Sequence, residues 1–148
     1  MSSERFASVS NEEIKRLKDE RHAINTRKAT ESAMRTLTAY VKEKNIDFDP
    51  EVVTKTGLNT ILERFFVEAR KENGDHYKKS GLQSLRAGIH RYFKQNRGFE
   101  MAKEECFVGA EEAYANEVFF TFNLISVSLF NHHAKAIKAF TPYQFYTP

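Results

Sequence analysis

The residues best suited to chemistry are lysines and arginines gathered in one acid-free window. Between His76 and Arg97 the chain carries six basic residues and no Asp or Glu. At about 100° per residue, a helix in this window puts its apolar residues on one side and its basic residues on another. Basic side chains neutralise phosphates, and Arg and Gln also reach base edges. The window predicts a nucleic-acid surface whose candidate contacts are Lys79, Gln83, Arg86, His90, Arg91, Lys94 and Arg97.

A second basic face is predicted over about 26–44. Its apolar set includes Ala33, Leu37 and Val41, and the opposite side carries the further candidates Arg27, Lys28, Arg35 and Lys42. Basic outer faces also occur on ordinary helices that are merely solvated. Both interpretations, a DNA surface and a solvated surface, stay open on charge alone.

Other site chemistries find little support. The sequence lacks a Gly-rich phosphate loop, and a single cysteine, Cys106, excludes an intrachain disulfide and a cysteine-rich zinc site. His132 and His133 are adjacent and therefore point apart, and Asp47 and Asp49 lie beside a proline in a link. We expect no metal, no cofactor and no small-molecule substrate.

The elements that must position these residues are helices. The chain has 148 residues with a net charge of +3, enough for about one domain. Periodicity predicts helices over about 11–21, 26–44, 56–71 and 81–96, with a short fifth helix within 100–116. Caps are predicted at Ser10 and Asn25, at Ser80 with Gln83, and helix ends at Asn73-Gly74 and Gly98. We therefore expect an all-α, compact bundle of four to five short helices.

The segment 120–148 has a different character. It is aromatic-rich and matches neither period well, so we expect it to be irregular. The apolar run VFFTFNLISVSLF has 13 residues, fewer than the ~20 that a membrane helix needs. This tail either covers the bundle or forms an exposed surface for self-association or a protein partner. We expect no membrane partner.

Two stretches resemble a known family. RFASVSNEEIKRLKDERHAINTRKATESAMRTLTAYVKEKNID and LERFFVEARKENGDHYKKSGLQSLRAGIHRYF are similar to the start of crypton-type tyrosine recombinase-like proteins of animals. The likeness covers residues 5–119 approximately. It depends on many matching residues in the same order and not on any one short motif. It implies a SAM-like core-binding domain over 1–119, transposon-derived and nuclear, in which two helices enter the grooves of duplex DNA.

The family's catalytic domain has no counterpart here. That domain supplies a His-x-x-Arg element, absent from this sequence, and a tyrosine nucleophile, for which Tyr143 and Tyr146 are poor matches. We therefore expect a DNA-binding domain that is not an enzyme, without DNA recombination or integration activity of its own. Segment 120–148 is then lineage-specific or the product of a truncated gene model. The alternative is a domesticated protein-interaction module that has lost DNA binding.

Overall fold

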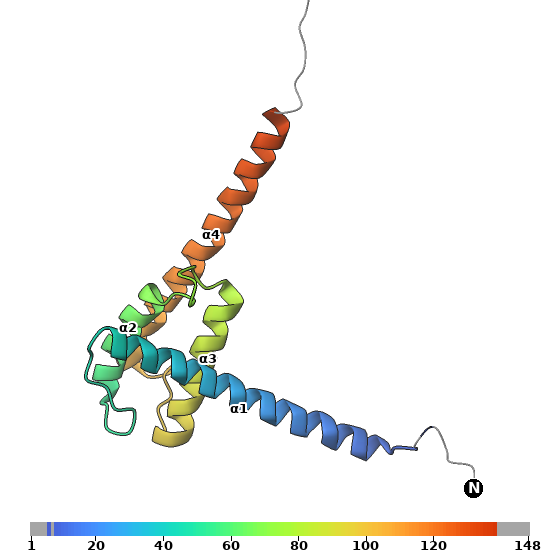
Figure 1. Ribbon diagram of the computed structural model, residues 1–148. Coiled ribbons are helices and arrows are strands. Elements are labelled where there is room, and N and C mark those ends of the chain that lie inside the picture. Colours follow the sequence, from blue (N-terminus) through green and yellow to red (C-terminus); the bar gives the residue numbers. More distant parts are fainter. Residues whose placement is uncertain (1–5, 7, 139–148) are drawn as a thin grey trace, which may run out of the picture. The chain divides into compact units, whose positions relative to one another are not determined.

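Helices account for most of the backbone in the computed structural model, which describes residues 6 and 8–138, with side chains described through Asn123. Within that part of the chain, β-pairing is limited to a single bridge between Arg70 and His76. The all-α class predicted from the sequence is confirmed. The elements in chain order are α1 (Asn11–Glu43), α2 (Lys55–Glu68), α3 (Lys79–Arg97), the 3-10 turn η1 (Glu105–Phe107) and α4 (Val108–Lys138) (Figure 1).

Helix α1 is one uninterrupted helix where two were expected. Ser10 caps its start, because its side chain accepts a hydrogen bond from the Glu13 amide at 3.2 Å. The break predicted at Asn25 is wrong. An N-cap needs extended backbone, whereas Asn25 is helical, and an Asn inside a helix costs only about 0.7 kcal/mol or less relative to Ala. With no Gly or Pro between 11 and 43, nothing forces the helix to end.

The end of α1 is set by Asn45, close to the predicted position. Asn45 has a φ of 53°, in the left-handed region. Its amide donates to the Lys42 carbonyl at 3.2 Å, and the Ile46 amide donates to the Val41 carbonyl at 2.9 Å. These two bonds form a Schellman motif, which satisfies carbonyls that the helix leaves unpaired.

Helix α2 begins and ends earlier than predicted. Thr54 is its cap and accepts from the Gly57 amide at 3.1 Å. Ala69 is extended, and the Lys71 amide pairs with the Asp75 carbonyl at 2.9 Å. Asn73-Gly74 therefore closes a turn outside the helix, with Gly74 at a φ of 84°, and does not end α2 as predicted.

Helix α3 agrees more closely with its prediction at its end than at its start. It begins at Lys79, so Ser80 lies in the first turn and is not the residue before the helix. Gly98 follows the end at a φ of 64° and donates to the Lys94 carbonyl at 3.1 Å, as its position predicts.

Helix α4 is the largest departure from the expectation. The short helix expected within 100–116 instead begins at Val108, after η1. It then continues through Lys138, across the boundary predicted at 119 and over residues 120–138, where irregular backbone was expected. Alternation of Phe with Ser, Thr and Asn obscured the helical period there. Residues 139–148, with Tyr143 and Tyr146, lie outside the described residues.

Two compact units divide the described chain. The first unit holds the residues through Glu51 together with Ser84–Glu100, and the second holds Val52–Gln83 and the residues from Met101 on. Each unit has buried apolar side chains. In the first unit these are Ala33, Leu37 and Val41 of α1, Leu85, Ile89 and Phe93 of α3, and Phe99.

The first unit packs α1 closely against α3. A Cβ on Gly88 would lie 2.5 Å from the Ala33 Cβ and 3.1 Å from the Ala29 carbonyl oxygen. The first distance is shorter than real Cβ contacts and the second is tight, so glycine is the residue that permits this approach of the two helices without a shift. Phe99 stacks on Phe93 with ring centroids 6.0 Å apart.

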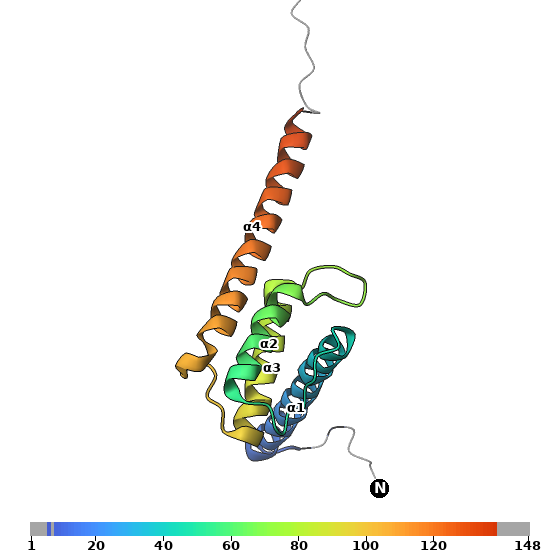
Figure 2. The same cartoon turned by 90° about the vertical axis from the view of Figure 1, so that its left-hand side faces the viewer.

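The second unit pairs α2 with the first turns of α4 (Figure 2). Leu58, Leu62, Phe65 and Phe66 of α2 are fully buried, and on α4 the buried residues include Ala110 and Ala113. The Asn59 side-chain oxygen accepts from the Ala110 amide at 2.9 Å. Because that amide is in the first turn of α4, Asn59 satisfies a donor that the helix cannot.

Candidate nucleic-acid interface

The exposed side of α1 carries a regular row of basic residues. Ala33, Leu37 and Val41 are buried, whereas Lys28, Arg35 and Lys42 are exposed on the opposite side of the helix. These three residues are seven apart, so successive members are about 10.5 Å apart along the axis with a drift of only about 20°. Among the described residues, none of the three side chains has an ion pair or hydrogen bond within the chain.

Arg21 extends this row and was missed from the sequence. It lies seven residues before Lys28 and is exposed. The heptad spacing was visible, but a helix break at Asn25 would have put Arg21 on a different helix. We call Arg21, Lys28, Arg35 and Lys42 the α1 basic row. It spans about 32 Å of one helix at the usual rise per residue.

Arg91 and Arg97 on α3 are engaged within the fold. The Arg91 guanidinium donates to the Thr30 hydroxyl oxygen at 2.6 Å and to the Thr26 carbonyl at 3.3 Å. That of Arg97 donates to the Pro50 carbonyl at 2.7 Å and lies over the Phe99 ring, 4.8 Å from its centroid. Both side chains are half-buried. These two arginines therefore join α3 to α1 and to the link that follows α1.

Several other predicted contacts have partners in the chain. Lys94 is exposed and pairs with Glu100 at 3.0 Å, and Arg27 pairs with Glu31 at 3.8 Å. Exposed pairs of this kind contribute little to stability, so both bases can exchange partners. Arg86 and His90 are half-buried and also interact with other groups of the protein.

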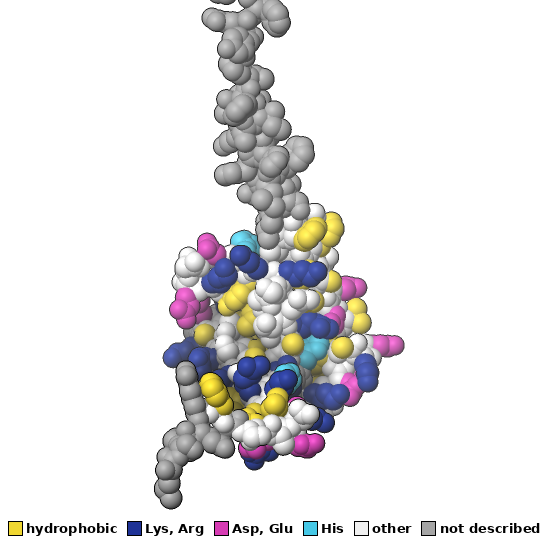
Figure 3. All heavy atoms as spheres, turned by 90° about the vertical axis from the view of Figure 1, so that its right-hand side faces the viewer, with side chains coloured by type: hydrophobic (Ala, Val, Ile, Leu, Met, Phe, Trp, Pro, Cys, Tyr) yellow, Lys and Arg dark blue, Asp and Glu magenta, His cyan; other side chains and the backbone are white. Residues whose placement is uncertain are grey.

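Lys79 and Gln83 belong to the second unit. Both are exposed, on the first two turns of α3. In Figure 3, Lys and Arg side chains are visible at many points of the described surface, with Asp and Glu side chains among them. The sign of the side-chain charge alone therefore does not define a patch. The α1 basic row differs from the other basic residues in its regular spacing along one helix.

Tyr92 and Glu51 form a polar pair in the first unit. The phenol donates to Glu51 Oε1 at 3.1 Å. Burial, and then this hydrogen bond to a carboxylate, raise the pKa of Tyr92 above its ordinary value of 10.0. Asp49 accepts from the Glu51 amide at 2.8 Å, which is a turn contact and agrees with the loop role predicted for it.

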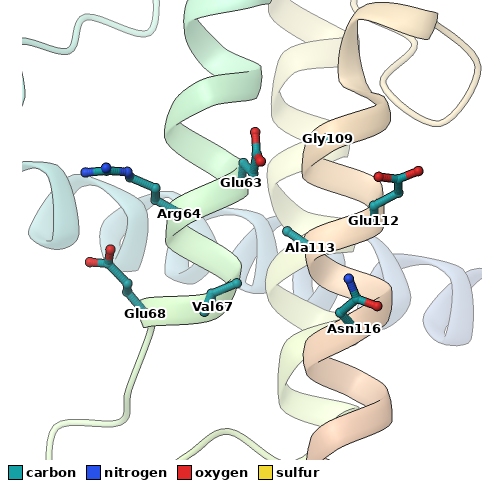
Figure 4. Close-up of a pocket in the computed structure, with 8 residues that line it drawn as sticks. All are labelled: Glu63, Arg64, Val67, Glu68, Gly109, Glu112, Ala113 and Asn116. Atoms are coloured by element: carbon teal, nitrogen blue, oxygen red, sulfur yellow. The ribbon is translucent and has the colours of Figure 1, made fainter.

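A pocket in the second unit has the wrong charge for a phosphate. It has a volume of about 370 Å³ and lies between α2 and α4 (Figure 4). Its charged residues are Glu63, Glu68 and Glu112 with Arg64, a net charge of −2.

Over the described residues, no group of three His, Cys, Asp or Glu is arranged to hold a metal ion. The same part of the chain contains no helix long and apolar enough to cross a membrane.

No family model, no curated protein and no solved structure matches this chain. The resemblance to crypton-type recombinase-like proteins therefore stays a prediction. The candidate interface rests on the geometry of α1 and α3 alone.

Proposed function

We propose that this chain is a non-catalytic module that binds duplex DNA by neutralising phosphates. The observation that carries the proposal is the α1 basic row: a single helix displays Lys28, Arg35 and Lys42 at equal spacing, with exposed side chains that have no partner among the described residues. A buried face on the same helix fixes the direction in which the row points.

Arg86 and Lys94 of α3 are secondary contacts in this proposal, and Arg91 and Arg97 act by holding the fold. Long basic side chains at even spacing suit the regular charge of a phosphate backbone better than they suit one base sequence. We therefore infer weak sequence preference and, at physiological salt, an affinity on the order of micromolar or weaker.

The experiment is a titration of a short labelled duplex with the full chain at low and moderate salt. Binding that weakens steeply with salt supports the proposal, because each phosphate contact releases condensed counterions. No binding at low salt, or binding indifferent to salt, rejects it. Strand cleavage is not expected in the same mixtures. If DNA is the partner, a tagged chain should accumulate in the nucleus.

A second candidate function is a protein-interaction module, and one observation favours it. Phe119, Phe120 and Phe122 of α4 are each more than half exposed. Such a module would show no binding in the duplex titration. In that case the exposed aromatic residues, and not the basic row, would be the functional surface.

A further inference from the structure

Helix α4 exposes a cluster of phenylalanines that its own unit leaves uncovered. Phe119 is 62% exposed, and Phe120 and Phe122 are each 61% exposed. The rings of Phe119 and Phe120 lie edge to face with centroids 6.1 Å apart. Aromatic side chains of this size are normally covered in a stable structure.

In the part of α4 whose side chains are described, through Asn123, the buried residues lie on one face. Ala110, Ala113 and Thr121 are buried, and they recur at the spacing of a single helical face. Figures 1 and 2 both show α4 continuing well past the end of α2. From Val118 to Asn131 the sequence has no charged residue, although Thr, Ser and Asn interrupt its apolar residues.

The charges of α4 are sorted toward its two ends. The acids Glu111, Glu112 and Glu117 all precede the apolar segment, and the bases Lys135 and Lys138 both follow it. Two copies of α4 side by side in parallel would place acids against acids and bases against bases. Two antiparallel copies would place each acidic end against a basic end, and a two-fold axis would repeat the contact.

We propose that the occupant of this surface is a second copy of the chain, paired antiparallel along α4. With the two-fold axis near Ile125, Glu112 lies level with the partner's Lys138, and the partner's Glu112 lies level with Lys138. The three exposed phenylalanines then lie within the contact. The proposal is independent of DNA binding.

The exposed phenylalanines supply part of the area that such a pair needs. Each phenylalanine at about 60% exposure offers roughly 100 Å² or more, so three from each copy supply roughly 600–700 Å². A specific interface buries about 1,200–2,000 Å² in total. The phenylalanines therefore account for about half of the lower figure, and other residues must supply the rest.

The first test is the mass of the full chain in solution by sedimentation across a concentration series. A monomer–dimer equilibrium is expected. The double variant Phe119→Asp/Phe122→Asp should raise the dimer dissociation constant by at least about 100-fold. Val52 is 71% exposed in the same unit, and Val52→Asp is the matched control that should leave the equilibrium unchanged. Circular dichroism at a concentration where the chain is monomeric shows whether each variant is folded.

The second test is the orientation of the pair. In a Cys106→Ser background, chains carrying Glu112→Cys are mixed with chains carrying Lys138→Cys and oxidised gently. The antiparallel pair predicts 112–138 cross-links between unlike chains and few between like chains. Cross-links of 112 to 112 and 138 to 138 would overturn the antiparallel arrangement.

The same measurements distinguish a second copy of the chain from other occupants of this surface. A chain that is monomeric at every concentration overturns the proposal, as does an open series of larger assemblies in place of a dimer. A monomer that binds vesicles of phosphatidylcholine and phosphatidylserine through the three phenylalanines would overturn it in favour of a lipid surface.

Discussion

Arg91 of α3 reaches the Thr30 hydroxyl of α1 at 2.6 Å, the shortest of the contacts that its guanidinium makes. The Thr30 hydroxyl in turn donates to the Thr26 carbonyl at 3.0 Å. A residue that charge alone placed among the DNA contacts therefore connects the two helices of the first unit. The same relationship shows that Arg91 is committed to the fold.

Replacing Arg91 should reduce stability more than it reduces DNA affinity. Arg91→Ala removes a half-buried, charged hydrogen bond, so we expect a loss of about 1.5–3 kcal/mol in the free energy of unfolding. Denaturant unfolding of Arg91→Ala, Thr30→Val and the double variant measures the coupling between the two side chains. An unchanged unfolding midpoint together with a large loss of DNA affinity would show that Arg91 serves the ligand instead.

Gly88→Ala should destabilise the first unit even though alanine is the better helix former. The helix interior favours Ala over Gly by about 1 kcal/mol. The added Cβ would lie 2.5 Å from the Ala33 Cβ, and overpacking of this kind costs about 1–3 kcal/mol. A lower thermal midpoint is the expected result, with the exposed neighbour substitution Ala87→Ser as control. A higher midpoint would mean that α1 and α3 are not in close contact.

The continuity of α1 through Asn25 predicts the sign of the stability change that Asn25→Ala causes. Because Asn25 is inside the helix and exposed, Asn25→Ala should raise stability or helicity slightly, by a few tenths of a kcal/mol. If Asn25 were a cap, the same change would cost about 1 kcal/mol. Ser10→Ala, which removes a real cap, provides the comparison and should lower the helical signal in circular dichroism.

Stability should fall in alkaline solution as Tyr92 ionises. The folded-state pKa of Tyr92 is raised above 10.0 by burial and by Glu51, so the unfolded chain loses this proton first. The stabilisation is present below pH 10 and is lost as the pH rises through the folded-state value. Unfolding measured against pH for the wild type and Tyr92→Phe isolates the effect. Glu51→Gln should make the alkaline loss smaller, and an identical loss in Tyr92→Phe would contradict the assignment.

Local sequence rules predicted the helical class and several helix ends. Ser10 and Gly98 act where their chemistry suggested, because caps depend on residues close in sequence. The break predicted at Asn25 is wrong because a residue that favours cap positions does not interrupt a helix when the residues on both sides favour helix. The start of α4 and its run past residue 119 were not predicted, since the alternation of Phe with Ser, Thr and Asn obscures the helical period there.

The candidate site was predicted in part. The exposed face of α1 was identified, but Arg21 was separated from it by the expected break. The sequence could not distinguish Arg91 from Lys94, because the difference lies in Thr30, which is far away in the chain and meets Arg91 only in the folded unit. Charge patterns show which residues are basic, and tertiary contacts decide which of them are available.

The most direct test of the central claim compares two triple variants in the duplex titration. Lys28→Ala/Arg35→Ala/Lys42→Ala removes three members of the α1 basic row, and Lys15→Ala/Arg16→Ala/Lys18→Ala removes the same charge from other sides of the same helix. If the row contacts phosphates, its loss should lower the slope of log affinity against log salt by up to about 2.7 and abolish most binding, whereas the control should keep the wild-type slope. Equal effects of the two variants, or an unchanged slope after loss of the row, would contradict the account.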